Sequence, residues 1–228
     1  MTRAPLLLDD DGDASVATAI MMSHHGFRRD LARFRSALRT VGTDERQRLD
    51  ALRDEWRSFR NTLHGHHQAE DAGLFPHVAG QHESLRPTLA RLTADHERID
   101  PLLARGDQAF ADLPLAIEGA RQVIEDLTAL LDPHLATEEA DVVPLLRAAK
   151  AFPPPGTPEE AEMFAQGFAW ASHGIAPQVL ERVYAMLPPI VTSRLPAARS
   201  AFEERWRRVW GQIEAGASLS PIPDRHDP

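Results

Sequence analysis

The segment LHGHHQAEDAGLFP, residues 63–76, places three histidines within four positions, followed by two adjacent acids and a proline. One of these histidines continues a pattern that begins upstream. From Trp56, apolar residues recur at steps of three or four, and the same steps lead to His66 and Glu70. This spacing is that of one face of an α-helix. The segment therefore predicts a helix whose inward stripe changes from apolar to polar side chains.

The same periodicity extends over the surrounding chain and predicts an all-α protein. Four long helices are expected at residues 14–40, 44–78, 84–110 and 114–149. Candidate N-caps for the second and third of these are Thr43 or Asp44, and Ser84. Short connections between helices of similar length favour an antiparallel up-down four-helix bundle. The inward stripe is predicted to continue to Gly73 in the second helix and to Leu145 in the fourth.

Histidine and glutamate interrupt all four inward stripes, and the interruptions follow a pattern. The residues concerned are His24 in the first helix, His66 and Glu70 in the second, His96 in the third, and His134 and Glu138 in the fourth. An i, i+4 pair shares one helix face, so both side chains reach the same point. In an up-down bundle these positions lie near one end. Because buried carboxylates are costly without compensation, the set predicts a metal site.

An internal repeat selects among the clustered histidines. Residues 66–76 and 134–144 both read His-x-x-x-Glu-acid, then four residues and a proline. The repeat matches His66 rather than its neighbours, which are expected to support the ligands or face solvent. The flanking residues are His64, His67 and Asp71, and His25, which follows His24, has the same expected role.

Composition restricts the metal ligands and the partners that are expected for this chain. The 228-residue chain contains no cysteine, so a metal must be held by His, Asp or Glu. A net charge of −9 argues against nucleic acid as a main partner. No apolar stretch approaches the roughly 20 residues needed to span a bilayer, and the N-terminus does not read as a signal peptide. We therefore expect a soluble, cytoplasmic protein without a membrane partner.

The last third of the chain begins after a proline-rich break, AFPPPGTPEE at 151–160. Thr157 with Pro158 predicts the start of a new helix. Shorter helices are expected at 158–171, 175–187 and 195–213, and a disordered tail at 214–228. The predicted organisation is thus a bundle at 14–150 and a helical C-terminal extension at 158–213. The sequence leaves open whether this extension is a separate domain or a cover on the bundle.

The ordered histidines and glutamates resemble the hemerythrin-like (HHE cation-binding) family over about residues 14–150. That family is a four-helix bundle with a non-haem di-iron centre. Its pattern is His, His-x-x-x-Glu, His, His-x-x-x-Glu, which would be carried here by His24, His66, Glu70, His96, His134 and Glu138. The steps EDAGLFP and EEADVVP resemble the family's acid-to-proline steps, and HHGFRRDLARF resembles its first helix.

The resemblance to oxygen-carrying hemerythrins is incomplete. Those proteins use five histidines and two carboxylates, and their third helix supplies a second histidine one turn after the first. Here that position is Asp100, which is either a further ligand or a surface acid. Their fourth helix has its acid five residues after histidine, whereas both Glu138 and Glu139 are acidic here. These differences argue against simple reversible oxygen carriage.

Imidazole and carboxylate ligands without thiolate suit iron, manganese or zinc. The resemblance favours two iron ions, with an oxo, hydroxo or water bridge. The leading hypothesis is a protein that binds or senses O2, peroxide or nitric oxide, with modest peroxide decomposition as an added activity. The alternatives are an iron-binding regulator, whose metal occupancy controls the fold and a protein partner at the C-terminal helices, and a metal-free helical interaction module.

Overall fold

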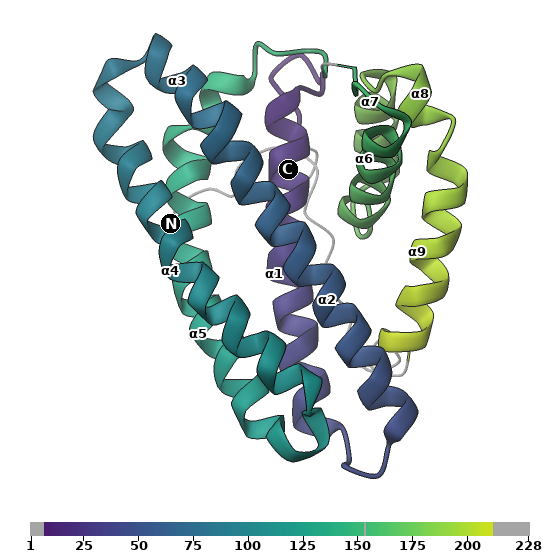
Figure 1. Ribbon diagram of the computed structural model, residues 1–228. Helices are drawn as coiled ribbons and strands as arrows, with labels where there is room; N and C mark the ends of the chain where they lie inside the picture. Colours follow the sequence, from purple (N-terminus) through teal and green to yellow (C-terminus); the bar gives the residue numbers. More distant parts are fainter. Residues whose placement is uncertain (1–6, 153, 212–228) are drawn as a thin grey trace, which may run out of the picture. The chain divides into compact units, whose positions relative to one another are not determined.

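The computed structural model describes residues 7–152 and 154–211, and every regular element within these ranges is helical. Figure 1 shows their arrangement along the chain. The α-helices are α1 (Val16–Thr40), α2 (Arg46–Ala69), α3 (Phe75–Gln81), α4 (Arg86–Ala111), α5 (Leu113–Asp141), α6 (Pro158–Ala171), α7 (Pro177–Ala185), α8 (Pro189–Thr192) and α9 (Leu195–Trp210). A π-helical turn, η1 (Glu70–Leu74), joins α2 to α3, and 3-10 turns occupy η2 (Glu83–Leu85) and η3 (Val143–Leu146). The predicted all-α fold is confirmed.

The described chain divides into two compact units. One contains residues 7–26 and Val142–Trp206, and the other contains Phe27–Asp141 with residues 207–211. The division into a bundle at 14–150 and an extension at 158–213 stays a prediction. The predicted tail lies outside the described residues. Within the described ranges, no helix combines the length and the apolar character needed to cross a bilayer.

The second unit contains α1 from Phe27 onward together with α2 to α5, with α4 running antiparallel beside α5 and α2 packed on α4 (Figure 1). Its aromatic core is formed where the Trp56 ring stacks on Phe110, at a centroid distance of 4.6 Å. Phe34 packs edge-on against both Phe59 and Phe110. His96 lies fourteen residues before Phe110 on the same helix, about 21 Å away at 1.5 Å per residue. The aromatic core and the histidines therefore occupy different levels of the bundle.

The inward stripes are largely as predicted, with two errors. Gly73 is exposed and Phe75 is buried instead. The reason is the π turn, in which the Phe75 N–H donates to the Glu70 carbonyl five residues earlier and so moves the inward face by one position. Leu145 is also exposed, because α5 ends at Asp141 and the following 3-10 turn changes the register.

One of the predicted helix N-caps is confirmed. Thr157 caps α6 in a full capping box with Glu160. The other predicted caps were wrong, because Glu45 and Leu85 precede α2 and α4 and neither helix start has a side-chain cap hydrogen bond. Glu45 instead accepts a hydrogen bond from the Gly42 N–H at 2.6 Å, which closes the preceding turn.

The first unit joins the beginning of α1 to the C-terminal helices. Trp170 of α6 lies against Gly26, where an added Cβ would approach its ring to 2.6 Å. Gly174 follows α6 with φ of +85°, the left-handed conformation that commonly ends a helix. An added Cβ at Gly174 would lie 3.2 Å from His25 Nε2. The C-terminal segment therefore packs on α1 at the two residues that follow His24.

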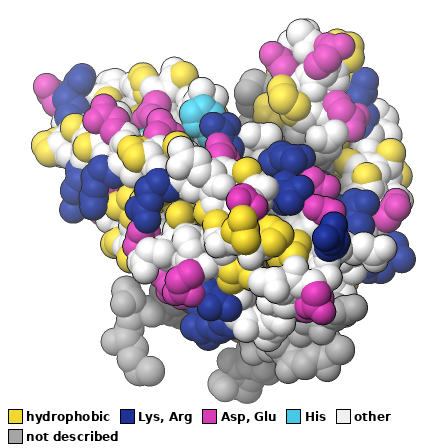
Figure 2. Space-filling view, turned by 60° about the horizontal axis from the view of Figure 1, so that its bottom comes forward, with side chains coloured by type: hydrophobic (Ala, Val, Ile, Leu, Met, Phe, Trp, Pro, Cys, Tyr) yellow, Lys and Arg dark blue, Asp and Glu magenta, His cyan; other side chains and the backbone are white. Residues whose placement is uncertain are grey.

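The exposed surface carries both signs of charge. On the face drawn in Figure 2, Lys and Arg side chains are interspersed with Asp and Glu side chains, and hydrophobic side chains lie between them. Ion pairs between helices of the second unit include Arg35 with Glu125 at 2.8 Å and Arg105 with Asp126 at 3.1 Å. Such exposed pairs contribute little to stability individually.

Candidate metal centre

The end of α2 brings one histidine and one glutamate together across a single helical turn. His66 Nε2 lies 2.8 Å from Glu70 Oε1. The Glu70 side chain is only 4% exposed, so its carboxylate is removed from water. A buried carboxylate requires a cation or hydrogen-bond donors around it. The surroundings of Glu70 therefore decide what the site can hold.

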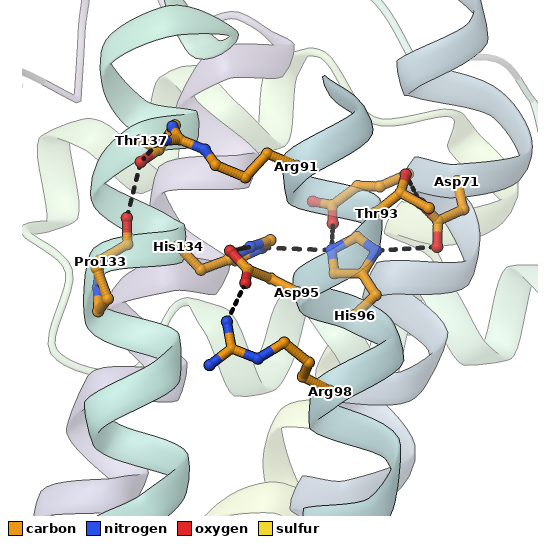
Figure 3. Close-up of polar contacts among 10 residues, drawn as sticks. Asp71, Arg91, Thr93, Asp95, His96, Arg98, Pro133, His134 and Thr137 are labelled. Atoms are coloured by element: carbon orange, nitrogen blue, oxygen red, sulfur yellow. Dashed lines mark hydrogen bonds and ion pairs between the residues drawn. The ribbon is translucent and has the colours of Figure 1, made fainter. Parts of the chain in front are cut away.

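The second oxygen of Glu70 faces a different pair of histidines. Glu70 Oε2 lies 3.5 Å from His96 Nε2 on α4, and that nitrogen lies 3.3 Å from His134 Nε2 on α5. Figure 3 shows the His96 and His134 rings converging between these two helices. Glu70 thus directs one carboxylate oxygen toward His66 and the other toward His96.

Two overlapping groups of ligand atoms result. In the first group, one ligand atom from each of His67, Glu70, His96 and His134 lies within 4.8 Å of the others, and all four residues are buried. In the second unit, His66, Glu70 and Glu138 form another group within the same 4.8 Å limit. Glu70 belongs to both groups. The arrangement therefore has two overlapping groups of candidate ligand atoms that share one carboxylate.

Five of the six predicted ligands lie in the second unit, and all five belong to these groups. Glu138, from the last turns of α5, is completely buried. His24 is also completely buried, and it lies on α1 one turn before Phe27. The Phe27 ring centroid is 5.2 Å from that of His66.

His67 is the member that the sequence interpretation placed outside the ligand set. It is 5% exposed, and its ring is nearly parallel to that of His96 at a centroid distance of 4.0 Å. The repeat with residues 134–144 could not reveal it, since the matching position there is Leu135. The adjacency of two histidines at the inward edge of the helix was the available signal.

Asp71 orients one ligand from outside the two groups. Its Oδ2 lies 2.9 Å from His96 Nδ1, and Thr93 Oγ1 donates a hydrogen bond to Oδ1 at 2.8 Å (Figure 3). With a proton on Nδ1, His96 donates to Asp71 and presents the Nε2 lone pair to Glu70 and His134. Carboxylate partners of this kind fix the tautomer of metal-binding histidines. Asp71 therefore orients the His96 imidazole.

The remaining acids near the centre are directed elsewhere. The Asp100 side chain is 64% exposed, and its carboxylate lies 3.5 Å from His64 Nδ1. Glu139 accepts a hydrogen bond from Arg28 at 2.5 Å. Neither acid belongs to the described groups of ligand atoms. Of the two open alternatives for Asp100, the structure supports a surface acid.

The donor set fits a transition metal. Imidazole nitrogens and carboxylate oxygens converge in a buried space, a combination that suits iron, manganese or zinc more than calcium or magnesium, which prefer oxygen alone. With neutral histidines, the two glutamates give the set a charge of −2, which one divalent ion would balance and two would exceed. The buried carboxylates therefore favour a bound cation, and the imidazoles around them could help to hold it.

Comparison with known proteins agrees with this geometry. The family model described as "Hemerythrin HHE cation binding domain" matches residues 15–146. No curated protein and no solved structure shows significant similarity to the chain. The matched segment covers more than half of the chain and contains every residue of both ligand groups. The chain belongs to the hemerythrin HHE cation-binding domain family.

Proposed function

We propose that this chain is a non-haem di-iron protein that binds or senses a small ligand such as O2, peroxide or nitric oxide. The proposed metal ligands are His24, His66, Glu70, His96, His134 and Glu138. The observation that carries the proposal is the placement of Glu70, whose two oxygens face His66 and His96. A carboxylate in this position suits two ions that share it as a bridge.

In this assignment each ion position draws on different helices. His66 and Glu138 belong to one position, and His96 and His134 belong to the other. His24 is assigned to the position of His66 because α1 is continuous through Phe27, one turn later, whose ring packs on His66. Residues three apart share a helix face, so the inward face that presents Phe27 also carries His24.

Two ferrous ions with open coordination positions would supply electrons and a binding place for a small oxygen or nitrogen ligand. The protein's own residues prepare that place. Phe27 and Phe75 pack against His66 and His96, which limits the access of water to the ligands. Asp71 holds the proton on His96 Nδ1 and so keeps Nε2 available. Peroxide decomposition would be an additional activity of the same site.

Metal analysis tests the proposal directly. Protein purified from iron-replete cells is expected to hold about two iron ions per chain and to change its visible spectrum on exposure to O2, peroxide or nitric oxide. His96→Ala should lower the iron content, because it removes a ligand that faces both Glu70 and His134. Less than about half an ion per chain in the wild type, unchanged by His96→Ala, would contradict the assignment.

A regulatory iron-binding role is the second candidate, and one contact favours it. The C-terminal segment packs on Gly26 and His25, which directly follow His24. Metal binding at His24 would therefore affect the packing of α6 on α1. This role predicts strong iron-dependent thermal stabilisation in the same preparation, with no spectral response to O2, peroxide or nitric oxide. A spectral response without that stabilisation favours the first candidate.

Asp71→Asn is expected to weaken metal binding without preventing folding. The amide retains the size of the side chain and a hydrogen-bond acceptor, but it loses the charge that stabilises the Nδ1 proton of His96. Loss of such a partner typically lowers metal affinity by about 10- to 100-fold. Competition with a chromophoric chelator measures the change. Asp100→Asn is the matched control, because its carboxylate is exposed near His64, and an equal loss of affinity in both variants would contradict the role of Asp71.

A further inference from the structure

His67 lies inside the centre, although it does not share the helical stripe of His66. Adjacent residues of an α-helix point about 100° apart, so the two histidines lie on either side of the stripe's midline. His66 is directed to Glu70 Oε1 and packs on Phe27. His67 is directed to the other side, where its ring lies 4.0 Å from that of His96 and 5.5 Å from that of His134. Two consecutive residues of α2 thus face two different ion positions.

The surroundings of His67 are those of a ligand. One of its ring nitrogens belongs to the group with Glu70, His96 and His134, whose ligand atoms all lie within 4.8 Å of one another. The residue is 5% exposed. Its ring stacks on that of His96 at a centroid distance of 4.0 Å and an interplanar angle of 13°. The position therefore places an imidazole nitrogen of His67 among the candidate ligand atoms of this group.

The helix α4 offers no second ligand atom to the group around His96. Its position one turn after His96 is Asp100, and this side chain is directed outward to His64. On the inward side of the same turn, Ile99 is completely buried and has no ligand atom. Within the group around His96, α4 therefore supplies one residue, α5 supplies His134, α2 supplies His67 and η1 supplies Glu70.

We infer that His67 is a metal ligand at the position shared by Glu70, His96 and His134, where it provides from α2 the imidazole that α4 does not provide. The inference rests on the proposed di-iron function and extends it. The complete set then has five histidines and two glutamates. Because His67 is neutral when it binds a metal, it adds a ligand and leaves the −2 charge of the set unchanged, whereas ligation by Asp100 would make that charge more negative.

Iron stoichiometry in a His67→Ala variant tests the inference. The variant is expected to fall from about two iron ions per chain to about one, because the position of His66 and Glu138 keeps its own ligands. The remaining ion should give the EPR signal of an isolated high-spin ferric site after oxidation, in place of a coupled pair. His64→Ala is the matched control, since it removes a nearby histidine of α2 that pairs with Asp100.

Two further variants keep the test decisive if His67→Ala folds poorly. His67→Gln retains a side chain of similar length, and it should show the same loss of one ion. His67→Gly leaves space for free imidazole, which should restore the second ion and the coupled signal. Iron content of about two ions and an unchanged spectrum in the His67 variants would overturn the inference and leave the di-iron proposal intact. Less than half an ion in the wild type would overturn both.

Discussion

Glu70→Ala is expected to remove nearly all bound iron, from about two ions per chain to well below one. The reason is that Glu70 belongs to both groups of ligand atoms, with Oε1 beside His66 and Oε2 beside His96. Loss of one histidine removes a ligand from one position, but loss of Glu70 affects both. Metal analysis after purification from iron-replete cells measures the effect, and Glu70→Gln repeats it with a side chain of the same shape.

The control for this variant is Glu97→Ala. Glu97 adjoins the ligand His96 but lies on the exposed side of α4, so its removal should leave about two ions bound. Thermal unfolding provides a second measurement, because a ligand that binds only the folded state raises stability by about 2.7 kcal/mol at 100 times its Kd. Iron should raise the Tm of Glu97→Ala and leave that of Glu70→Ala unchanged. Retention of two ions by Glu70→Ala would refute the shared-carboxylate assignment.

Gly106→Ala is expected to lower the free energy of unfolding by about 3 kcal/mol, although alanine favours helices. A Cβ at Gly106 would lie 2.0 Å from Trp56 Cζ2. The indole has little freedom to move away, since its Nε1 donates to Asp107 at 2.9 Å and its ring stacks on Phe110. The clash therefore requires displacement of the aromatic core. Urea denaturation of both proteins measures the difference.

Gly65→Ala is the matched control for this second variant. Gly65 lies on α2 in the same unit, and an added Cβ there would have no neighbour within 4 Å among the described residues. The substitution is expected to raise stability by about 0.5–1 kcal/mol, because alanine restricts the unfolded chain and glycine does not. Equal stabilities of Gly106→Ala and Gly65→Ala would contradict close packing of Trp56 on α4.

Most of the helices and their inward faces could be predicted from the sequence, because a period of 3.6 residues is a local property of the chain. The sequence placed Trp56 and Phe59 in the core and Glu70 on the same inward face, and all three are buried. It also identified the start of α6, since Thr157 and Glu160 satisfy that helix end without help from elsewhere. These features depend on residues within a few turns of one another.

Features that depend on which residues meet across helices could not be predicted from the local pattern and follow from the packing. The π turn at Glu70–Leu74 moved Phe75 inward, and the width of the buried face allowed His67 to reach His96. Asp100 and Glu139 were equivalent to ligands in the sequence, but their contacts with His64 and Arg28 direct them away. Periodicity specifies the direction of a side chain only to within part of a helical turn, whereas ligation depends on differences of an ångström between atoms from separate helices.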